Sequence, residues 1–149
     1  MYEYDISRPV STKEVLRLLL HLRMYERGVY YYAVLLMYWG ALEITEVLDA
    51  TVLKFKAIYD RIYSVDPRSA NKVKKYSPMW LKLRNEYNMM KLYNIKNKIG
   101  FPGSLNSIRK RRVIDMYNLR GIEFVAHFLG VPEKDYERLE EWIRRDLAK

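Results

Sequence analysis

The chain has 149 residues, enough for one domain with a hydrophobic core, and half of its residues are hydrophobic. It contains no cysteine, which excludes disulfides, zinc–thiolate centres and thiol catalysis. The net charge is +9 and is unevenly distributed: residues 67–121 hold 14 lysines and arginines but only two acids, a net charge of +12. A basic block this concentrated predicts a polyanionic partner.

The first ten residues, MYEYDISRPV, lack the basic start and apolar core of a signal peptide. We therefore expect an intracellular, cytoplasmic protein. The longest uncharged run covers residues 28–42, which is 15 residues, whereas a membrane helix needs about 20. This run predicts a buried core helix and no membrane span.

The first helix is predicted from the capping box STKE, in which Ser11 and Glu14 each accept the other's backbone N–H. It is expected to continue to about Gly28. Its buried side is predicted from four residues: Leu16, Leu19, Leu20 and Tyr25.

Ten residues, mostly apolar, then recur every three or four positions across residues 34–65. They are Val34, Met37, Ala41, Ile44, Leu48, Thr51, Phe55, Ile58, Ile62 and Val65. This heptad-like spacing passes through Gly40 and predicts one long central helix over about residues 29–64. Pro67 ends the pattern, because proline cannot continue the hydrogen-bond ladder of a helix.

Residues 68–78 are interpreted as a basic linker, followed by a third helix over about residues 78–98. The apolar stripe predicted for that helix consists of Trp80, Leu83, Tyr87 and Met90. A glycine- and proline-rich loop leads to a basic helix that ends near Gly121. No alternation typical of strands occurs, so the chain is predicted to be all-α: an elongated helical bundle and a single domain over residues 1–149.

The basic block supplies the candidate contacts to nucleic acid or another polyanion. These are Arg68, Lys72, Lys74, Lys75, Tyr76, Arg109, Lys110, Arg111, Arg112 and Arg120. Lysines beside an aromatic ring suit phosphate contacts combined with stacking. Asp115 lies four residues after Arg111 and can neutralise one cation of the run at 109–112. The alternative is that this run is a solvated helix face.

Residues 122–149 predict a C-terminal helical hairpin, and their spacing over 122–142 resembles the helix-turn-helix family. Ala126, Gly130 and Val131 occupy its small, turn and apolar positions. The second helix is acidic, however, and phosphates repel acids. We therefore expect the hairpin to pack on the bundle or to bind a protein through four residues: Glu133, Glu137, Glu140 and Glu141.

No pattern for catalysis or metal binding is present in the sequence. His21 and His127 lack a second ligand at a useful spacing, and GFPG at residues 100–103 lacks the lysine of a phosphate loop. We therefore expect a non-enzymatic protein with no cofactor and no metal.

Two stretches rich in tyrosine, isoleucine, lysine and arginine, GVYYYAVLLMYW (28–39) and SIRKRRVIDMYNLRG (107–121), suggest a family resemblance. The chain resembles small, cysteine-free helical proteins of viruses that infect hyperthermophilic archaea. The resemblance implies a DNA-coating nucleoprotein or an inhibitor of host machinery such as RNA polymerase.

The leading expectation is a nucleic-acid-binding protein that contacts backbone phosphates through residues 67–121. The first alternative is a regulator that binds an acidic surface of a nucleic-acid-processing complex. The second is a self-assembling virion subunit, which implies a homo-oligomer.

Overall fold

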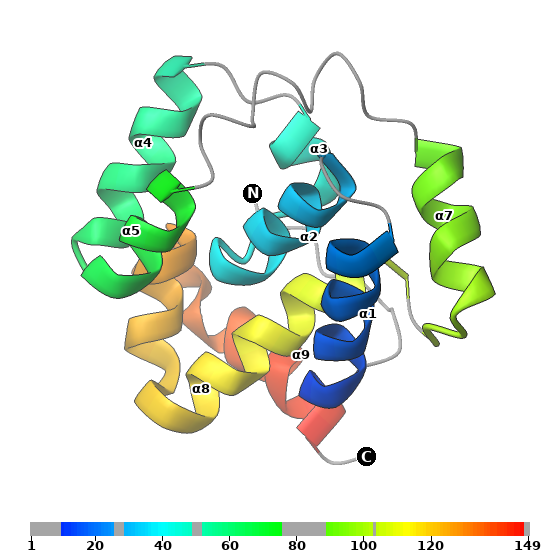
Figure 1. The fold of residues 1–149 in the computed structure, drawn as a ribbon. Helices are drawn as coiled ribbons and strands as arrows, with labels where there is room; N and C mark the ends of the chain where they lie inside the picture. The colour runs from blue at the N-terminus through cyan, green and yellow to red at the C-terminus, as the bar shows by residue number, and fades with distance from the viewer. Residues whose placement is uncertain (1–9, 26–28, 49–51, 76–88, 103, 148–149) are drawn as a thin grey trace.

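A computed structural model describes residues 10–25, 29–48, 52–75, 89–102 and 104–147. Throughout these ranges the chain forms helices joined by turns and short connections, with no strand, which confirms the all-α class (Figure 1). The helices are α1 (Thr12–Tyr25), α2 (Val29–Trp39), α3 (Ile44–Leu48), α4 (Val52–Tyr63), α5 (Pro67–Lys75), α7 (Met89–Lys98), α8 (Asn106–Leu129) and α9 (Tyr136–Leu147). A 3-10 turn, η2 (Glu133–Asp135), precedes α9.

Helix α2 lies among the other helices and packs against α1, α3, α5 and α8 (Figure 1). Its sequence, VYYYAVLLMYW, carries no charge, and Ala33, Val34, Leu36 and Met37 are fully buried. A helix that is apolar on all sides must be covered on all sides. The helices consequently gather around α2 in place of the expected elongated bundle.

The capping box at the start of α1 is confirmed. The Glu14 N–H donates to Ser11 Oγ at 3.1 Å, and the Ser11 N–H donates to Glu14 Oε1 at 3.3 Å. The predicted buried side of α1 is partly wrong, because Leu16 and Leu20 are each 57% exposed while Leu19 is buried. The Tyr25 side chain lies outside the described residues. The buried face follows the helical spacing of four residues: Val15, Leu18, Leu19 and Leu22.

The expected long helix over residues 29–64 is wrong, because α2 ends at Trp39. The Leu42 N–H donates to the Met37 carbonyl at 3.1 Å, and the Ala41 N–H donates to the Tyr38 carbonyl at 3.3 Å. Ala41 has the left-handed φ of 49°. These two bonds around a left-handed residue form a Schellman motif, which ends a helix and turns the chain.

Gly40 fits this turn because it has no side chain. A Cβ at Gly40 would lie 2.9 Å from both the Leu36 carbonyl oxygen and the Leu42 side chain. Helix α3 then starts after Glu43, whose N–H donates to Glu46 Oε1 at 3.1 Å. The apolar spacing of residues 34–65 is therefore divided among three short helices, α2, α3 and α4. Thr51 and the side chains of Ile44 and Leu48 lie outside the described residues. Ile62 in α4 is fully buried, but Phe55 is only half-buried.

The interpretation as a linker is also wrong for residues 68–75, since residues 67–75 form α5, while residues 76–78 lie outside the described residues. Pro67 occupies the first helical position, where its missing N–H costs nothing. The Asp66 carboxylate caps the helix by accepting the Ser69 N–H at 3.3 Å and the Ser69 hydroxyl at 2.8 Å. Of the predicted helix over 78–98, α7 confirms the last ten residues. Its predicted stripe residues, Trp80, Leu83, Tyr87 and the Met90 side chain, lie outside the described residues.

The end of the basic helix near Gly121 is seen as a kink within α8. Gly121 has φ 84° and ψ −177°, which separates residues 106–120 from residues 122–129. Helix α8 ends at Gly130, also left-handed, and α9 folds back against α8. Leu139, Trp142 and Ile143 are buried, so this C-terminal hairpin is part of the core.

Candidate nucleic-acid interface

The four consecutive cations Arg109, Lys110, Arg111 and Arg112 occupy the first two turns of α8. Successive residues of an α-helix point about 100° apart, so four adjacent side chains face different directions. Each of the four meets a different part of the fold.

Arg109 and Lys110 are buried, with 3% and 2% of their surface exposed. Arg109 forms an ion pair with Glu43, the residue before α3. The Lys110 Nζ lies 4.4 Å from the ring centroid of Trp142 in α9. A cation over an indole face is attracted by the ring electrons, and burial strengthens the attraction. These two residues therefore attach α3 and α9 to α8.

Arg111 attaches the start of α1. Its Nε and Nη2 donate to Asp115 Oδ1 at 3.0 and 2.7 Å, and its Nη1 donates to the Val10 carbonyl at 3.3 Å. The Thr12 hydroxyl donates to the other Asp115 oxygen at 3.0 Å. The predicted Arg111–Asp115 pair is confirmed, and it has the added role of holding the segment before α1.

Arg112 joins α8 to α5 and α2. Its Nη2 donates to Ser69 Oγ at 2.9 Å, and its Cζ lies 4.9 Å from the Trp39 ring centroid and 5.3 Å from that of Tyr38. The guanidinium thus contacts one hydroxyl and two aromatic rings. Arginine suits this position because its planar group stacks and donates at the same time.

These contacts change the interpretation of the basic run. Arg109 and Lys110 are removed from the candidate polyanion surface, because a phosphate cannot reach a side chain that the protein covers. Arg111 and Arg112 are half-buried and held by internal partners. The mutual repulsion of the four cations is offset by partners from separate parts of the fold. Of these partners, spacing in the sequence reveals only Asp115. The other two are distant in the chain, because Glu43 is 66 residues from Arg109 and Ser69 is 43 residues from Arg112.

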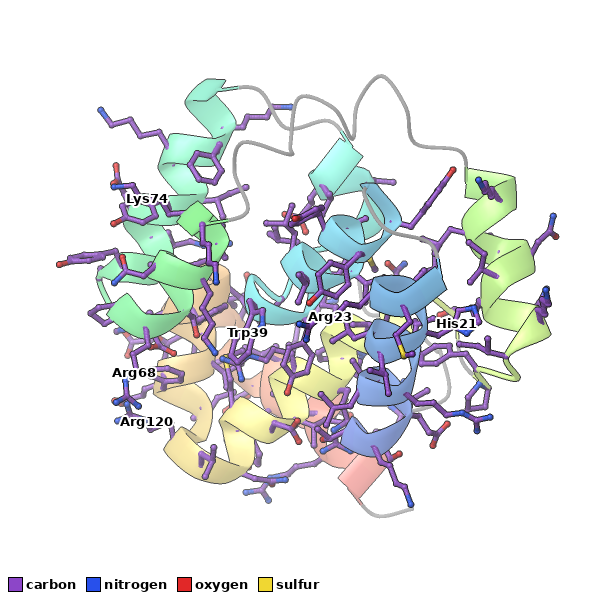
Figure 2. All side chains as sticks on the ribbon, in the orientation of Figure 1. His21, Arg23, Trp39, Arg68, Lys74 and Arg120 are labelled. Carbon is purple, nitrogen blue, oxygen red and sulfur yellow. The ribbon has the colours of Figure 1, made fainter. Side chains whose placement is uncertain are left out.

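Among the candidate contacts, the exposed cations lie mainly on α5. Four of its nine residues are exposed cations, which we call the α5 basic face: Arg68, Lys72, Lys74 and Lys75. The opposite side of α5 buries Ser69, Ala70 and Val73, and residues 67–75 include no acid. Arg120 of α8 is exposed too, and Figure 2 shows it along the same edge of the molecule as Arg68 and Lys74. Tyr76 lies outside the described residues.

Aromatic rings lie directly beneath several of these cations. The Lys72 Nζ is 3.5 Å from the Trp39 ring centroid, and the Lys74 Nζ is 5.7 Å from that of Tyr59 in α4. Arg120 Cζ is 5.1 Å from the Phe124 centroid. Such cation–π contacts restrict the position of the charged group at the end of a long side chain, and the charged group remains in contact with solvent.

The predicted acidic surface is mostly exposed. Glu133, Glu137 and Glu141 point to solvent, whereas Glu140 is half-buried and lies 3.4 Å from Arg144 Nη2. The Arg144 Nε donates to the Tyr117 hydroxyl at 3.0 Å. That hydrogen bond, with the electrostatic interactions of Tyr117 and Glu140, raises the pKa of Arg144 above its usual value. The hydrogen bond between Arg144 and Tyr117 thus joins α9 to α8 at the surface.

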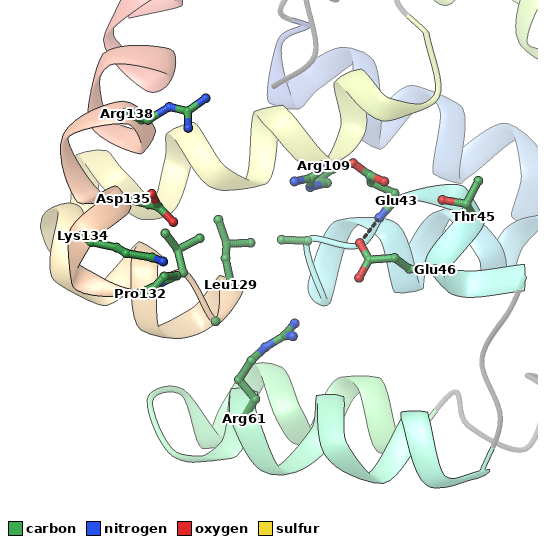
Figure 3. A pocket seen from close by; sticks show the side chains of 13 residues that line it. Glu43, Thr45, Glu46, Arg61, Arg109, Leu129, Pro132, Lys134, Asp135 and Arg138 are labelled. Atoms are coloured by element: carbon green, nitrogen blue, oxygen red, sulfur yellow. Dashed lines mark hydrogen bonds and ion pairs between the residues drawn. The ribbon is translucent and has the colours of Figure 1, made fainter. Parts of the chain in front are cut away.

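The structure also contains a cleft that local sequence patterns did not indicate (Figure 3). It has a volume of about 770 Å³ and lies between the turn before α3, Arg61 of α4, and the turn before α9. Its charged lining residues are Glu43, Glu46, Arg61, Arg109, Lys134, Asp135 and Arg138. The Arg61 Nε donates to the Phe128 carbonyl at 2.9 Å. Four cations facing three acids give the cleft no strong preference for a polyanion.

No protein-family model, curated protein or solved structure matches this chain. Among the described residues, no three His, Asp or Glu side chains come together in a way that could hold a metal ion. Within the same ranges, no helix combines the length and the hydropathy that crossing a bilayer requires.

Proposed function

We propose that the protein binds nucleic acid by contacting backbone phosphates through the α5 basic face and Arg120. The observation that supports this proposal is α5 itself, a nine-residue helix with four exposed cations and no acid. A local excess of positive charge attracts phosphates, and the release of condensed counterions drives their binding.

In this proposal the run at residues 109–112 has a supporting role. Arg112 contacts Ser69 of α5 and Trp39 of α2, and Trp39 in turn lies under Lys72. The buried cations of α8 thus position the helix that carries the exposed ones. Binding is expected to tolerate any base sequence, since phosphate contacts carry no sequence information.

A salt titration of duplex binding tests the proposal. If about four phosphates are contacted, log K should fall with log salt with a slope of roughly −3 to −4. The double variant Lys74→Ala/Lys75→Ala should flatten this slope by about two units on two unrelated duplexes.

The matched control is Lys134→Ala/Arg138→Ala, which removes the same charge from two exposed residues of the C-terminal hairpin. Its slope should equal that of the wild type. Equal slopes for both double variants would contradict the assignment to α5. Binding weaker than about 10⁻⁴ M at low salt would contradict nucleic-acid binding altogether.

A row of exposed apolar residues on α1 favours a second candidate function, self-assembly. Leu16, Leu20 and Met24 are 57%, 57% and 59% exposed and lie on one helix face at intervals of four residues. Exposed apolar rows of this kind are typical of protein contacts. Analytical ultracentrifugation should show concentration-dependent association that Leu16→Ser/Leu20→Ser abolishes. A wild-type monomer at all concentrations would contradict self-assembly and leave nucleic-acid binding untouched.

A further inference from the structure

Three aromatic residues form a continuous row along α4, which we call the α4 aromatic row: Phe55, Tyr59 and Tyr63. The ring centroids are 6.4 Å apart for the first pair and 5.7 Å apart for the second, with interplanar angles of 25° and 33°. Phe55 and Tyr59 are half-buried, whereas Tyr63 is 50% exposed. The row therefore emerges from the core and ends in a tyrosine ring that solvent reaches.

Two lysines, Lys74 of α5 and Lys56 of α4, lie near this row. Helix α5 packs against α4 (Figure 1). Its Lys74 Nζ lies 5.7 Å from the Tyr59 ring centroid. On α4 itself, Lys56 is exposed and precedes Tyr59 by three residues and Tyr63 by seven, which places all three on one side of the helix. Flat rings and positive charges thus share one surface.

We propose that the α4 aromatic row stacks against unpaired bases while the α5 basic face holds the phosphates of the same strand, so that the ligand is single-stranded nucleic acid. This inference rests on the proposed function and specifies its ligand. In a duplex, neighbouring bases cover each base face, so protein rings cannot stack on them without opening the helix. A single strand offers both its phosphates and its base faces, and stacking accepts any base.

One acid lies within this surface. Asp60 is exposed, adjacent to Tyr59 and three residues before Tyr63. Its carboxylate repels phosphates, so Asp60→Asn should tighten binding to every nucleic-acid probe by a similar factor. That variant reports on phosphate proximity and leaves the rings unchanged.

Three probes of equal length separate stacking from simple charge attraction: a single-stranded oligothymidine of about 12 nucleotides, an abasic strand with the same backbone, and a duplex. Wild-type protein should prefer oligothymidine to the abasic strand by at least about 5-fold, the lower end of the effect of one stacked base. It should also prefer oligothymidine to the duplex.

Variants assign that preference to the row. Tyr63→Ala should remove most of the preference for oligothymidine over the abasic strand without weakening abasic binding, and Tyr63→Phe should retain it. Lys74→Ala should weaken both single strands equally. The matched control is Tyr93→Ala, because Tyr93 of α7 is also exposed and also has a lysine, Lys96, at 5.5 Å from its ring centroid. It should behave like wild type.

The outcomes distinguish this inference from the proposed function. If the wild-type protein binds oligothymidine and the abasic strand with equal affinity, stacking is overturned but phosphate binding is not. Tighter binding to the duplex than to oligothymidine would have the same consequence. An unchanged preference in a folded Tyr63→Ala protein, judged by its circular dichroism spectrum, would overturn the role of the row. Failure to bind any of the three probes at low salt would overturn both proposals.

Discussion

The ion pair between Arg109 and Glu43 predicts an asymmetric response to mutation. The Arg109 side chain is only 4% exposed, whereas that of Glu43 is 24% exposed. Glu43→Ala leaves the covered Arg109 guanidinium without the Glu43 carboxylate. Removing one partner and leaving the other charge buried lowers the free energy of unfolding by about 3–5 kcal/mol. Arg109→Met leaves a carboxylate that water still reaches and fills the space of the arginine stem. We expect it to cost about 1–3 kcal/mol.

Urea unfolding followed by far-UV circular dichroism measures these differences. The total stability of a domain is about 5–15 kcal/mol, so Glu43→Ala should shift the midpoint clearly. The double variant Glu43→Ala/Arg109→Met should cost less than the sum of the single variants by at least about 1 kcal/mol, since both remove one interaction. Glu141→Ala, an exposed carboxylate on α9, serves as control and should stay within about 0.5 kcal/mol of wild type.

Either of two results would contradict this prediction. If Glu43→Ala costs less than about 1 kcal/mol, the guanidinium is not held in a covered position by this carboxylate. If Arg109→Met is the more damaging variant, burial does not decide the asymmetry. In the first case Arg109 would return to the candidate polyanion surface.

Three further predictions concern the fold. Gly130→Ala should lower the free energy of unfolding more than Gly100→Ala. Both glycines have φ 75°, a conformation that costs a residue with a side chain about 1–2 kcal/mol. Only at Gly130 would the new Cβ also lie 3.0 Å from a neighbouring side chain. Thermal unfolding of the two variants compares them, and equal costs would mean that the neighbour moves freely. Ile62→Ala should cost about 2–5 kcal/mol, because this side chain is fully buried, whereas Phe55→Ala should cost less than its usual 3–5 kcal/mol because Phe55 is half-buried. Urea unfolding tests the order, and its reversal would place Phe55 in the core. The circular dichroism spectrum should be dominated by helix, and a strand-rich spectrum would contradict the architecture.

Local signals in the sequence determined the fold class and several element ends. The capping box at Ser11 and Glu14 predicts the start of α1, because its two hydrogen bonds form between residues three positions apart. The kink at Gly121 and the end of α8 at Gly130 follow from glycine's tolerance of a left-handed backbone. The uncharged run at residues 28–42 predicts a covered helix, and α2 is covered.

Local sequence signals were ambiguous where one pattern was compatible with two structures. Apolar residues at intervals of three and four describe one long helix or several short helices that each bury one face. The turn at Gly40 and Ala41 decides for short helices, because Gly40 permits a close backbone approach that a side chain would block. Residues 68–75 similarly looked like a linker, although Asp66 and Pro67 together start a helix.

Only the tertiary structure decided which cations face solvent. Charge counting correctly selected residues 67–121 as basic, and the α5 basic face is exposed as that count suggested. Residues 109–112 have the same charges but different surroundings, because the partners of Arg109, Lys110 and Arg112 come from parts of the chain distant in the sequence. A cation's side-chain chemistry is local, but its burial depends on what packs against it. The sequence therefore determined how much positive charge this segment carries, and the contacts of α8 with Glu43, with Ser69 of α5 and with Trp142 of α9 determined where that charge is available.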